Sequence, residues 1–339
     1  MQKSKVQVKS QKLRELKSAQ DRRKMIEGEM GVDLSHIGAF SLDERVASTR
    51  NCENMIGATQ IPLGIAGPLQ IKVERLKLKD TQSKLLTKNT NSDNLQLTTY
   101  NYFVPLATTE GALVASVNRG CKAIFESGGA TVDVEHIGVT RGPVFRVKNS
   151  TEGALFAAFL KDRFVDIAAV SESTSSHLKL LRFEETAVGL YRYVRFYFDT
   201  QDAMGLNMIT IATEKIAQFI ESEIGIACLD ISGNFCVDKK PSYQNFIRGR
   251  GYMVRAEITV PGEVVLNVLK TTPEKIYESW LAKCMIGSAV SGSLGYNAQY
   301  ANIVAALGIA TGQDPAHVVE GSMGITTVEN VKSQSSNVK

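Results

Sequence analysis

The sequence predicts an α+β fold in which a large mixed α/β domain carries a smaller inserted domain. Two observations support this prediction. The segment TVDVEHIGVTRGPVFRV (131–147) alternates apolar and polar residues as strands do. From Val144 to Ser232, strand and amphipathic helix patterns follow one another in the order βαββαβ, and the residues after Ser232 return to alternating loops and helices. The domain boundaries expected are therefore 41–143 and 232–329 for the large domain and 144–231 for the inserted one.

The first 40 residues are expected to form a basic helical arm. The chain of 339 residues has a formal net charge of +4, and much of the excess lies in MQKSKVQVKSQKLRELKSAQDRRK (1–24). A solvated arm or surface helix is favoured over a nucleic-acid or membrane contact, because no aromatic or strongly apolar face accompanies the charge. The N-terminus lacks the apolar core of a signal peptide, and ANIVAALGIA (301–310) is too short to span a membrane.

The first part of the large domain begins with turns and an extended segment. NMIGATQIPLGIAGPLQI (54–71) mixes Gly and Pro with short apolar runs, and residues 73–100 resemble a long surface loop or an exposed hairpin. A helix is expected over 108–124, capped by Thr108 or Thr109, with Glu110 in its first turn. On physical grounds alone, the favoured role of Glu110 is to complement the positive end of the helix dipole.

The inserted domain is predicted element by element. VFRV is a strand, TEGALFAAFLKDRF contains a helix, and LKLLRFEETA and YRYVRFYFD are strands joined through Gly189. A second helix, GLNMITIATEKIAQFI, leads to a last strand, IACLDIS. This order is that of the ferredoxin-like arrangement.

The second part of the large domain alternates loops and helices. Thr272, Pro273 and Glu274 are typical of a helix N-terminus, as a cap, a first-turn proline and an early acid. GSLGYNAQYANIVAALGIATGQD (292–314) is expected to contain an apolar helix, and residues 330–339 a disordered tail. The five cysteines are dispersed, which favours reduced thiols and a cytoplasmic location. The four histidines show no paired spacing, so no metal centre is expected.

Three short stretches could carry chemistry, and each has a plainer alternative. DAMGLN (202–207) stands before a helix, where backbone N–H groups could approach a phosphate, or where Asp202 could simply cap the helix. Lys239 in DKKP could stabilise a developing oxyanion or lie in a solvated turn. Asp314 could bind loop amides or set the pKa of a neighbour.

Taken together, several stretches resemble the hydroxymethylglutaryl-CoA reductase family. They are ENMIGATQIPLGIAGPL, TTEGALVASVNRGCKAI, VTRGPV, DAMGLNM, SGNFCVDKKP and TGQD, which occur in the family's order. The resemblance implies a substrate-binding large domain and an inserted ferredoxin-like domain that binds the nicotinamide cofactor. It also implies reduction of 3-hydroxy-3-methylglutaryl-CoA to mevalonate, for isoprenoid synthesis, with release of coenzyme A. Because family active sites lie between two subunits, a homodimer or higher homo-oligomer is expected.

The resemblance assigns roles to individual residues. Glu110 would donate a proton, Lys239 would stabilise the substrate oxyanion, and Asp314 would couple the two. The residues expected to bind the hydroxymethylglutaryl part are Arg141, Ser232, Asp238, Lys240, Lys283 and Asn302. Those expected to contact coenzyme A are Ser116, Asn118 and Arg119. Those expected to bind the cofactor are Asp202, Met204, Gly205 and Asn207.

The sequence departs from the family pattern at three places. STS is followed by Ser176 and His177 rather than by the arginine that often binds the cofactor's 2′-phosphate. Lys179 could take the place of that arginine, and NADPH is expected, with NADH as the alternative. Gln299 replaces the histidine of the NAH segment. The family's Gly-rich segment and late histidine after ITTVE are not in this sequence, whose last histidine is His317. A truncated, non-catalytic CoA-thioester-binding relative, or a fragment, is therefore the alternative reading.

Overall fold

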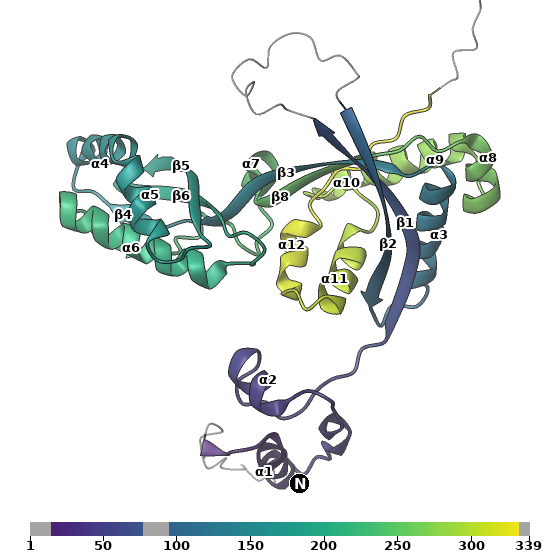
Figure 1. Ribbon diagram of the computed structural model, residues 1–339, viewed down its shortest axis with the longest axis horizontal. Coiled ribbons are helices and arrows are strands. Elements are labelled where there is room, and N and C mark those ends of the chain that lie inside the picture. Colours follow the sequence, from purple (N-terminus) through teal and green to yellow (C-terminus); the bar gives the residue numbers. More distant parts are fainter. Residues whose placement is uncertain (1–14, 77–94, 332–339) are drawn as a thin grey trace, which may run out of the picture. The chain divides into compact units, whose positions relative to one another are not determined.

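The computed structural model describes residues 15–76 and 95–331, and the chain divides into two compact units, Met1–Pro62 and Leu63–Lys339 (Figure 1). The first unit contains helices α1 (Ala19–Met30) and α2 (Glu44–Arg50), with a 3₁₀ turn at Ser35–Gly38. Ser18 and Asp43 begin the two helices, because each side chain accepts a hydrogen bond from a backbone N–H of the first turn. Residues 1–14 of the expected basic arm lie outside the described residues.

The second unit contains one mixed sheet with helices packed on it. Its strands are β1 (Leu63–Leu76), β2 (Leu95–Ala107), β3 (Ala130–Arg141), β4 (Val144–Arg146), β5 (Lys179–Val188), β6 (Tyr191–Asp199), β7 (Cys228–Asp230) and β8 (Gly251–Glu257). Its longer helices are α3 (Leu113–Glu126), α4 (Ser150–Asp162), α5 (Phe164–Glu172), α6 (Leu206–Ile224), α9 (Pro273–Trp280) and α11 (Tyr300–Ala310).

Short helical segments complete the second unit. They are α7 (Tyr243–Arg248), α8 (Gly262–Val264), α10 (Ser288–Ser291), α12 (Val318–Gly321), the π-helical turns Val265–Leu269 and Leu281–Gly287, and a 3₁₀ turn at Pro315–His317. Helix α9 starts as expected, because Thr272 accepts a hydrogen bond from the Lys275 N–H and Pro273 occupies the first helical position.

Strand β3 takes part in two groups of strands. Its residues 130–132 pair with β1 in parallel, its residues 131–138 pair with β8 in antiparallel, and β1 pairs with β2. Its last residues, 139–141, pair with β6, which also pairs with β5 and β4, and β4 pairs with β7. The mixed α/β architecture is thus confirmed. The loop or hairpin expected over 73–100 has its ends in β1 and β2, and residues 77–94 lie outside the described residues.

Two apolar cores hold the site-bearing elements. The larger one fills the space between β4–β7 and helices α4, α5 and α6, with Phe156, Phe196 and Ile216 fully buried. The smaller one contains Leu106 of β2, Leu113 and Cys121 of α3, and Ala306 of α11. Helix α3 packs on β1 and α11 on β2, so this second core fixes the positions of both helices (Figure 1).

The start of α3 corrects one expectation. The helix begins at Leu113, after Ala112 in the left-handed region (φ 67°), and no side chain caps it. The Thr108 hydroxyl instead accepts a hydrogen bond from the Glu110 N–H at 3.0 Å, which forms a local turn ahead of the helix. The expected cap by Thr108 or Thr109, and the place of Glu110 in the first helical turn, were therefore wrong. Glu110 is an exposed turn residue, which weakens the helix-dipole explanation.

Candidate active site

The loop after β7 that carries Lys239 has a strained backbone. Asn234, Val237 and Lys239 all have left-handed φ values, 59°, 53° and 55°. For a β-branched residue such as Val237 this conformation is a clear outlier, and left-handed backbone costs roughly 1–2 kcal/mol per residue. Such a conformation persists where the surroundings over-determine it, which is common at functional sites.

Buried hydrogen bonds hold this loop in place. The Asn245 amide donates to the Val237 carbonyl at 2.8 Å, and the Thr140 hydroxyl donates to the Cys236 carbonyl at 2.9 Å. Asn245 is itself fixed by the fully buried Arg195 of β6, whose guanidinium donates to the Asn245 side-chain oxygen at 3.1 Å. The loop is therefore tied to the sheet rather than lying in a solvated turn.

Lys239 and Asp314 form an ion pair, with the Lys239 Nζ 2.5 Å from the Asp314 Oδ2. Both side chains are 32% exposed, so a ligand could reach the ammonium group. The hydrogen bond to Asp314 raises the pKa of Lys239, and the same bond, with one from the Ala316 N–H, lowers the pKa of Asp314. Asp314 thus does both things that the sequence left open, since it binds a loop amide and sets its neighbour's pKa.

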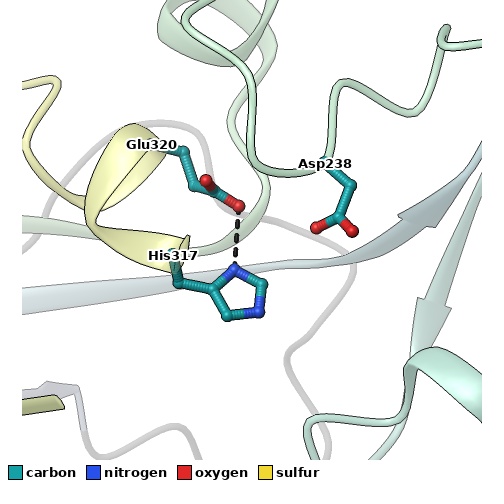
Figure 2. Close-up of side chains that lie close together, drawn as sticks. All are labelled: Asp238, His317 and Glu320. Atoms are coloured by element: carbon teal, nitrogen blue, oxygen red, sulfur yellow. Dashed lines mark hydrogen bonds and ion pairs between the residues drawn. The ribbon is translucent and has the colours of Figure 1, made fainter. Parts of the chain in front are cut away.

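A second group of charges contacts the loop that carries Lys239. Arg250 is only 7% exposed, and its guanidinium lies 2.7 Å from the Asp238 carboxylate and 3.2 Å from that of Glu320. Glu320 also contacts the His317 Nδ1 at 2.9 Å and accepts a hydrogen bond from the Lys239 N–H at 3.3 Å. Figure 2 shows Glu320 and His317 joined on one side, with the Asp238 loop opposite.

Asp238, His317 and Glu320 also offer three potential metal-ligating atoms within 4.8 Å of one another (Figure 2). Arg250 already supplies a positive charge to both carboxylates, so this arrangement is better explained as a buried ion-pair network than as a cation site. The expectation that the chain holds no metal stays a prediction.

Glu110 lies at a different place, beside helix α11. The Asn302 amide of α11 donates to the Glu110 Oε2 at 2.7 Å. Asn302 is in the first turn of α11, and Asp314 follows its other end. At 1.5 Å per residue, the helix from Asn302 to Ala310 alone is about 12 Å long. Among the described residues, no hydrogen bond or ion pair joins Glu110 to Lys239 or Asp314.

A cavity of about 460 Å³ opens next to the Lys239–Asp314 pair. Its lining comes from β3, from the segment before α6, from the start of β8 and from the chain around Asp314. The lining residues are His136, Val139, Thr200, Gln201, Asp202, Ala203, Met204, Arg250, Gly251, Tyr252, Gln313 and His317. The structure thus brings two of the expected cofactor residues, Asp202 and Met204, into one cavity wall with Gln313 and His317, which lie on either side of Asp314 in the sequence.

The expected cofactor motif has a specific local geometry. Gly205 precedes α6 with a φ of 73°, and no side chain caps the helix, so the expectation that Asp202 could cap it was wrong. An added Cβ at Gly205 would lie 2.4 Å from the Thr200 Cγ2, because Thr200 closes the turn through a hydrogen bond to the Ala203 carbonyl. Asn207 is exposed in the first turn of α6.

The other expected binding residues are spread over the second unit. Lys240 is next to the catalytic candidate Lys239, and its Nζ lies 3.4 Å from the Asp238 carbonyl. The Ser232 hydroxyl contacts the Cys236 sulfur at 3.6 Å. Arg141 ends β3, and its buried Nε has no hydrogen-bond partner within the described chain. Lys283 is exposed on a π-helical turn, and no hydrogen bond or ion pair among the described residues ties it to this group.

The residues expected to contact coenzyme A lie on α3. Asn118 and Arg119 are exposed, Ser116 is half-buried, and the Asn118 side chain accepts a hydrogen bond from the Gly67 N–H at 3.0 Å. All five cysteines are free thiols, as expected. Within the described ranges, we find no helix that is long and apolar enough to cross a membrane.

Arg250, His317 and Glu320 belong to this site but were not predicted as site residues from the sequence. A signal existed for two of them, because Asp314, His317 and Glu320 follow one another at intervals of three residues across a short helical stretch, a spacing that places side chains on one face. Arg250 stands in a turn between α7 and β8 and carried no comparable pattern.

Comparison with known proteins gives a consistent result. The family profile described as hydroxymethylglutaryl-coenzyme A reductase matches residues 18–338. The chain is 47% identical over 312 residues to the 3-hydroxy-3-methylglutaryl-coenzyme A reductase of Methanothermobacter thermautotrophicus, covering 92% of this chain and 73% of that protein. It is 47% identical over 314 residues to the protein of the same name from Methanocaldococcus jannaschii, covering 91% and 72%. A class II enzyme of this name from Streptococcus pneumoniae, solved with NADPH bound, shares the fold with a TM-score of 0.58 at 17% identity, over 88% of this chain and 73% of that one.

Proposed function

This chain belongs to the hydroxymethylglutaryl-coenzyme A reductase family, and on that premise we propose that it reduces 3-hydroxy-3-methylglutaryl-CoA to mevalonate with NADPH. The reaction adds two hydrides and two protons to the thioester and releases coenzyme A as a thiol. It therefore needs a group that stabilises negative charge on the substrate oxygen and groups that donate protons. The single observation that carries the proposal is the Lys239–Asp314 ion pair, because Gln313, the residue before Asp314, lines the same cavity as the Asp202–Met204 stretch.

Lys239 is proposed to stabilise the substrate oxyanion. Asp314 holds the ammonium group 2.5 Å away and keeps it protonated, because the hydrogen bond raises the pKa of Lys239. A cation fixed in advance by a strained, well-supported loop needs little reorganisation when the charge develops, which is the main source of electrostatic catalysis. Asp238 and Lys240 flank it, and with Arg141, Ser232, Lys283 and Asn302 they are proposed to bind the acyl part of the substrate.

We propose that the cavity receives the nicotinamide cofactor. It is open, it lies at the uncapped N-terminus of the long helix α6, and Asp202, Met204, Gly205 and Asn207 surround that terminus. When bound, NADPH supplies the hydride. We propose that residues 144–231 form the inserted ferredoxin-like, cofactor-binding domain, which the observed element order from β4 to β7 supports. NADPH rather than NADH is the proposed cofactor.

Glu110 is proposed to donate a proton, oriented by Asn302. Within one chain, Glu110 is bound near the start of α11, and Asp314, the partner of Lys239, follows the other end of that helix. We propose that the Glu110 and the Lys239 that act on one substrate come from different subunits. This separation supports a homodimer or higher homo-oligomer, with Ser116, Asn118 and Arg119 of α3 contacting coenzyme A. A cytoplasmic location stays a prediction from the reduced cysteines.

A spectrophotometric assay tests the proposed function. The chain is mixed with 3-hydroxy-3-methylglutaryl-CoA and NADPH, and the loss of reduced cofactor is followed, with NADH in a parallel series and Lys239→Ala as the reference variant. We expect turnover that disappears in Lys239→Ala and a higher kcat/KM for NADPH than for NADH. A folded wild-type protein that binds the CoA thioester without turnover would instead support the non-catalytic alternative.

A further inference from the structure

Glu320 connects three segments that meet at the Lys239 loop. Its Oε1 accepts the Lys239 backbone N–H at 3.3 Å, contacts the Arg250 guanidinium at 3.2 Å and lies 2.9 Å from the His317 ring nitrogen. These partners belong to the strained loop, to the turn before β8 and to the 3₁₀ turn Pro315–His317, which Asp314 caps. Glu320 is 13% exposed, which makes it more buried than either member of the Lys239–Asp314 pair.

The contact with the Lys239 backbone matters because of the local strain. Lys239 has a φ of 55°, and non-glycine residues keep this conformation only when neighbouring groups hold them. Asn245 and Thr140 hold the preceding residues, at the Val237 and Cys236 carbonyls. Glu320 is the side chain that binds the backbone of Lys239 itself.

Glu320 also fixes the partner of Lys239. His317 follows Asp314 by three residues, and its ring is held against Glu320 (Figure 2). One carboxylate therefore binds both the loop that carries the ammonium group and the segment that carries Asp314. From this geometry we propose that Glu320 is a positioning residue, which sets the Lys239 ammonium against Asp314.

This inference rests on the proposed role of Lys239. Glu320 does not reach the substrate in this proposal; it acts through Lys239. The charged and titratable groups that face the Lys239–Asp314 pair are Asp238, Arg250, His317 and Glu320. Removing the negative charge of Glu320 therefore removes one of the anions that favour the protonated form of Lys239.

The test uses the full chain with Glu320→Ala and Glu320→Gln. Glu184→Gln is the matched control, because Glu184 is also a half-buried glutamate that binds an arginine and a second donor, Arg182 and Tyr197, but away from Lys239. We expect Glu320→Ala to lower kcat by about 10- to 100-fold with little change in either KM, since a small misplacement of a catalytic group has an effect of this size. Glu320→Gln, which keeps an acceptor for the Lys239 N–H, should recover part of the loss.

A second measurement does not depend on turnover. An amine-acylating reagent labels only unprotonated lysines, and mass spectrometry can compare Lys239 with the exposed Lys283 in the same sample. In Glu320→Gln the labelling ratio of Lys239 to Lys283 should rise, and the alkaline limb of the kcat profile should move to lower pH. Glu184→Gln should change neither.

The outcomes separate the two claims. If Lys239→Ala keeps its activity, the proposed function of Lys239 is wrong. If Lys239→Ala is inactive while Glu320→Ala and Glu320→Gln match Glu184→Gln in kcat and in labelling ratio, Lys239 keeps its role and the positioning role of Glu320 is overturned.

Discussion

Gly205 offers a direct test of how the cofactor motif is built. Replacing it by alanine adds one methyl group at a left-handed position (φ 73°) directly against Thr200, whose Cγ2 and Cβ would lie 2.4 and 2.6 Å from the new carbon. Gly225 at the other end of α6 is the matched control, because its φ is 70° and an added Cβ would meet nothing within 4 Å. Both variants share the backbone cost, and only Gly205→Ala adds the collision.

The expected magnitudes follow from these two terms. A non-glycine residue in the left-handed region costs roughly 1–2 kcal/mol, which the lower entropy of the unfolded alanine chain partly offsets. Overpacking a rigid contact adds about 1–3 kcal/mol, and Thr200 cannot move easily because its hydroxyl binds the Ala203 carbonyl at 2.7 Å. We therefore expect the free energy of unfolding to fall by about 1 kcal/mol in Gly225→Ala and by about 2–4 kcal/mol in Gly205→Ala.

Urea unfolding gives the free energies, and steady-state kinetics gives the functional effect. Because the collision pushes on the turn that carries Asp202 and Met204, Gly205→Ala should also raise the KM for NADPH by about tenfold, while Gly225→Ala leaves it unchanged. Equal losses of stability in the two variants, with equal KM values, would show that Thr200 does not constrain this turn and would refute the reasoning.

Three further predictions concern the charge pair, the Glu110 contact and the core. Asp314→Asn should lower kcat by about 10²–10³-fold and shift its alkaline limb to lower pH, because a neutral amide replaces the carboxylate whose hydrogen bond is the main cause that raises the pKa of Lys239. The wild-type protein should therefore keep Lys239 protonated, and the stabilising pair intact, to a higher pH than a free lysine would allow. Asn302→Ala should reduce kcat by about tenfold, since Glu110 loses the donor at 2.7 Å that orients it. Phe156→Ala should destabilise the protein by about 3–5 kcal/mol, as expected for a fully buried aromatic ring.

Each of these predictions has a contrary result. An Asp314→Asn profile with an unmoved alkaline limb would mean that another group titrates there. An Asn302→Ala variant with wild-type kcat would remove Asn302 as an orienting group. Val165→Ala, at an exposed position, is the control for Phe156→Ala. If Phe156→Ala lowered the free energy of unfolding by less than about 1 kcal/mol, the larger core would have to repack around the gap.

Much of the fold followed from periodicity. Helices α4 and α6 and strands β5 and β6 lie where the apolar spacing placed them, because each buries one regular face in the larger core. Helix α9 was found from its Thr-Pro-Glu start. The start of α3 was misplaced because Thr108 binds the backbone two residues further on, and sequence alone does not show which of two nearby N–H groups a hydroxyl will choose.

The candidate site was less accessible to sequence reasoning. Local patterns drew attention to Lys239, Asp314 and Glu110 one by one, each with a plainer explanation. Only the family resemblance grouped the three, since no local rule relates residues that far apart in the chain. The pairing of Lys239 with Asp314 emerges only in three dimensions. Arg250, whose charge holds Asp238 and Glu320 together, was missed. The burial of a single arginine depends on tertiary packing, and the residues next to it in the sequence show no pattern that predicts it.

Strand β3 has a consequence for cooperativity. Its first part belongs to the ladder with β1 and β8 and its last three paired residues to the ladder with β6, and Gly138 (φ 97°) marks the change between them. Melting either ladder therefore removes hydrogen bonds from a strand that the other one needs. Although residues 144–231 have their own apolar core, they share this strand with the rest of the second unit. In calorimetric terms, residues 63–339 should absorb heat as one transition rather than two.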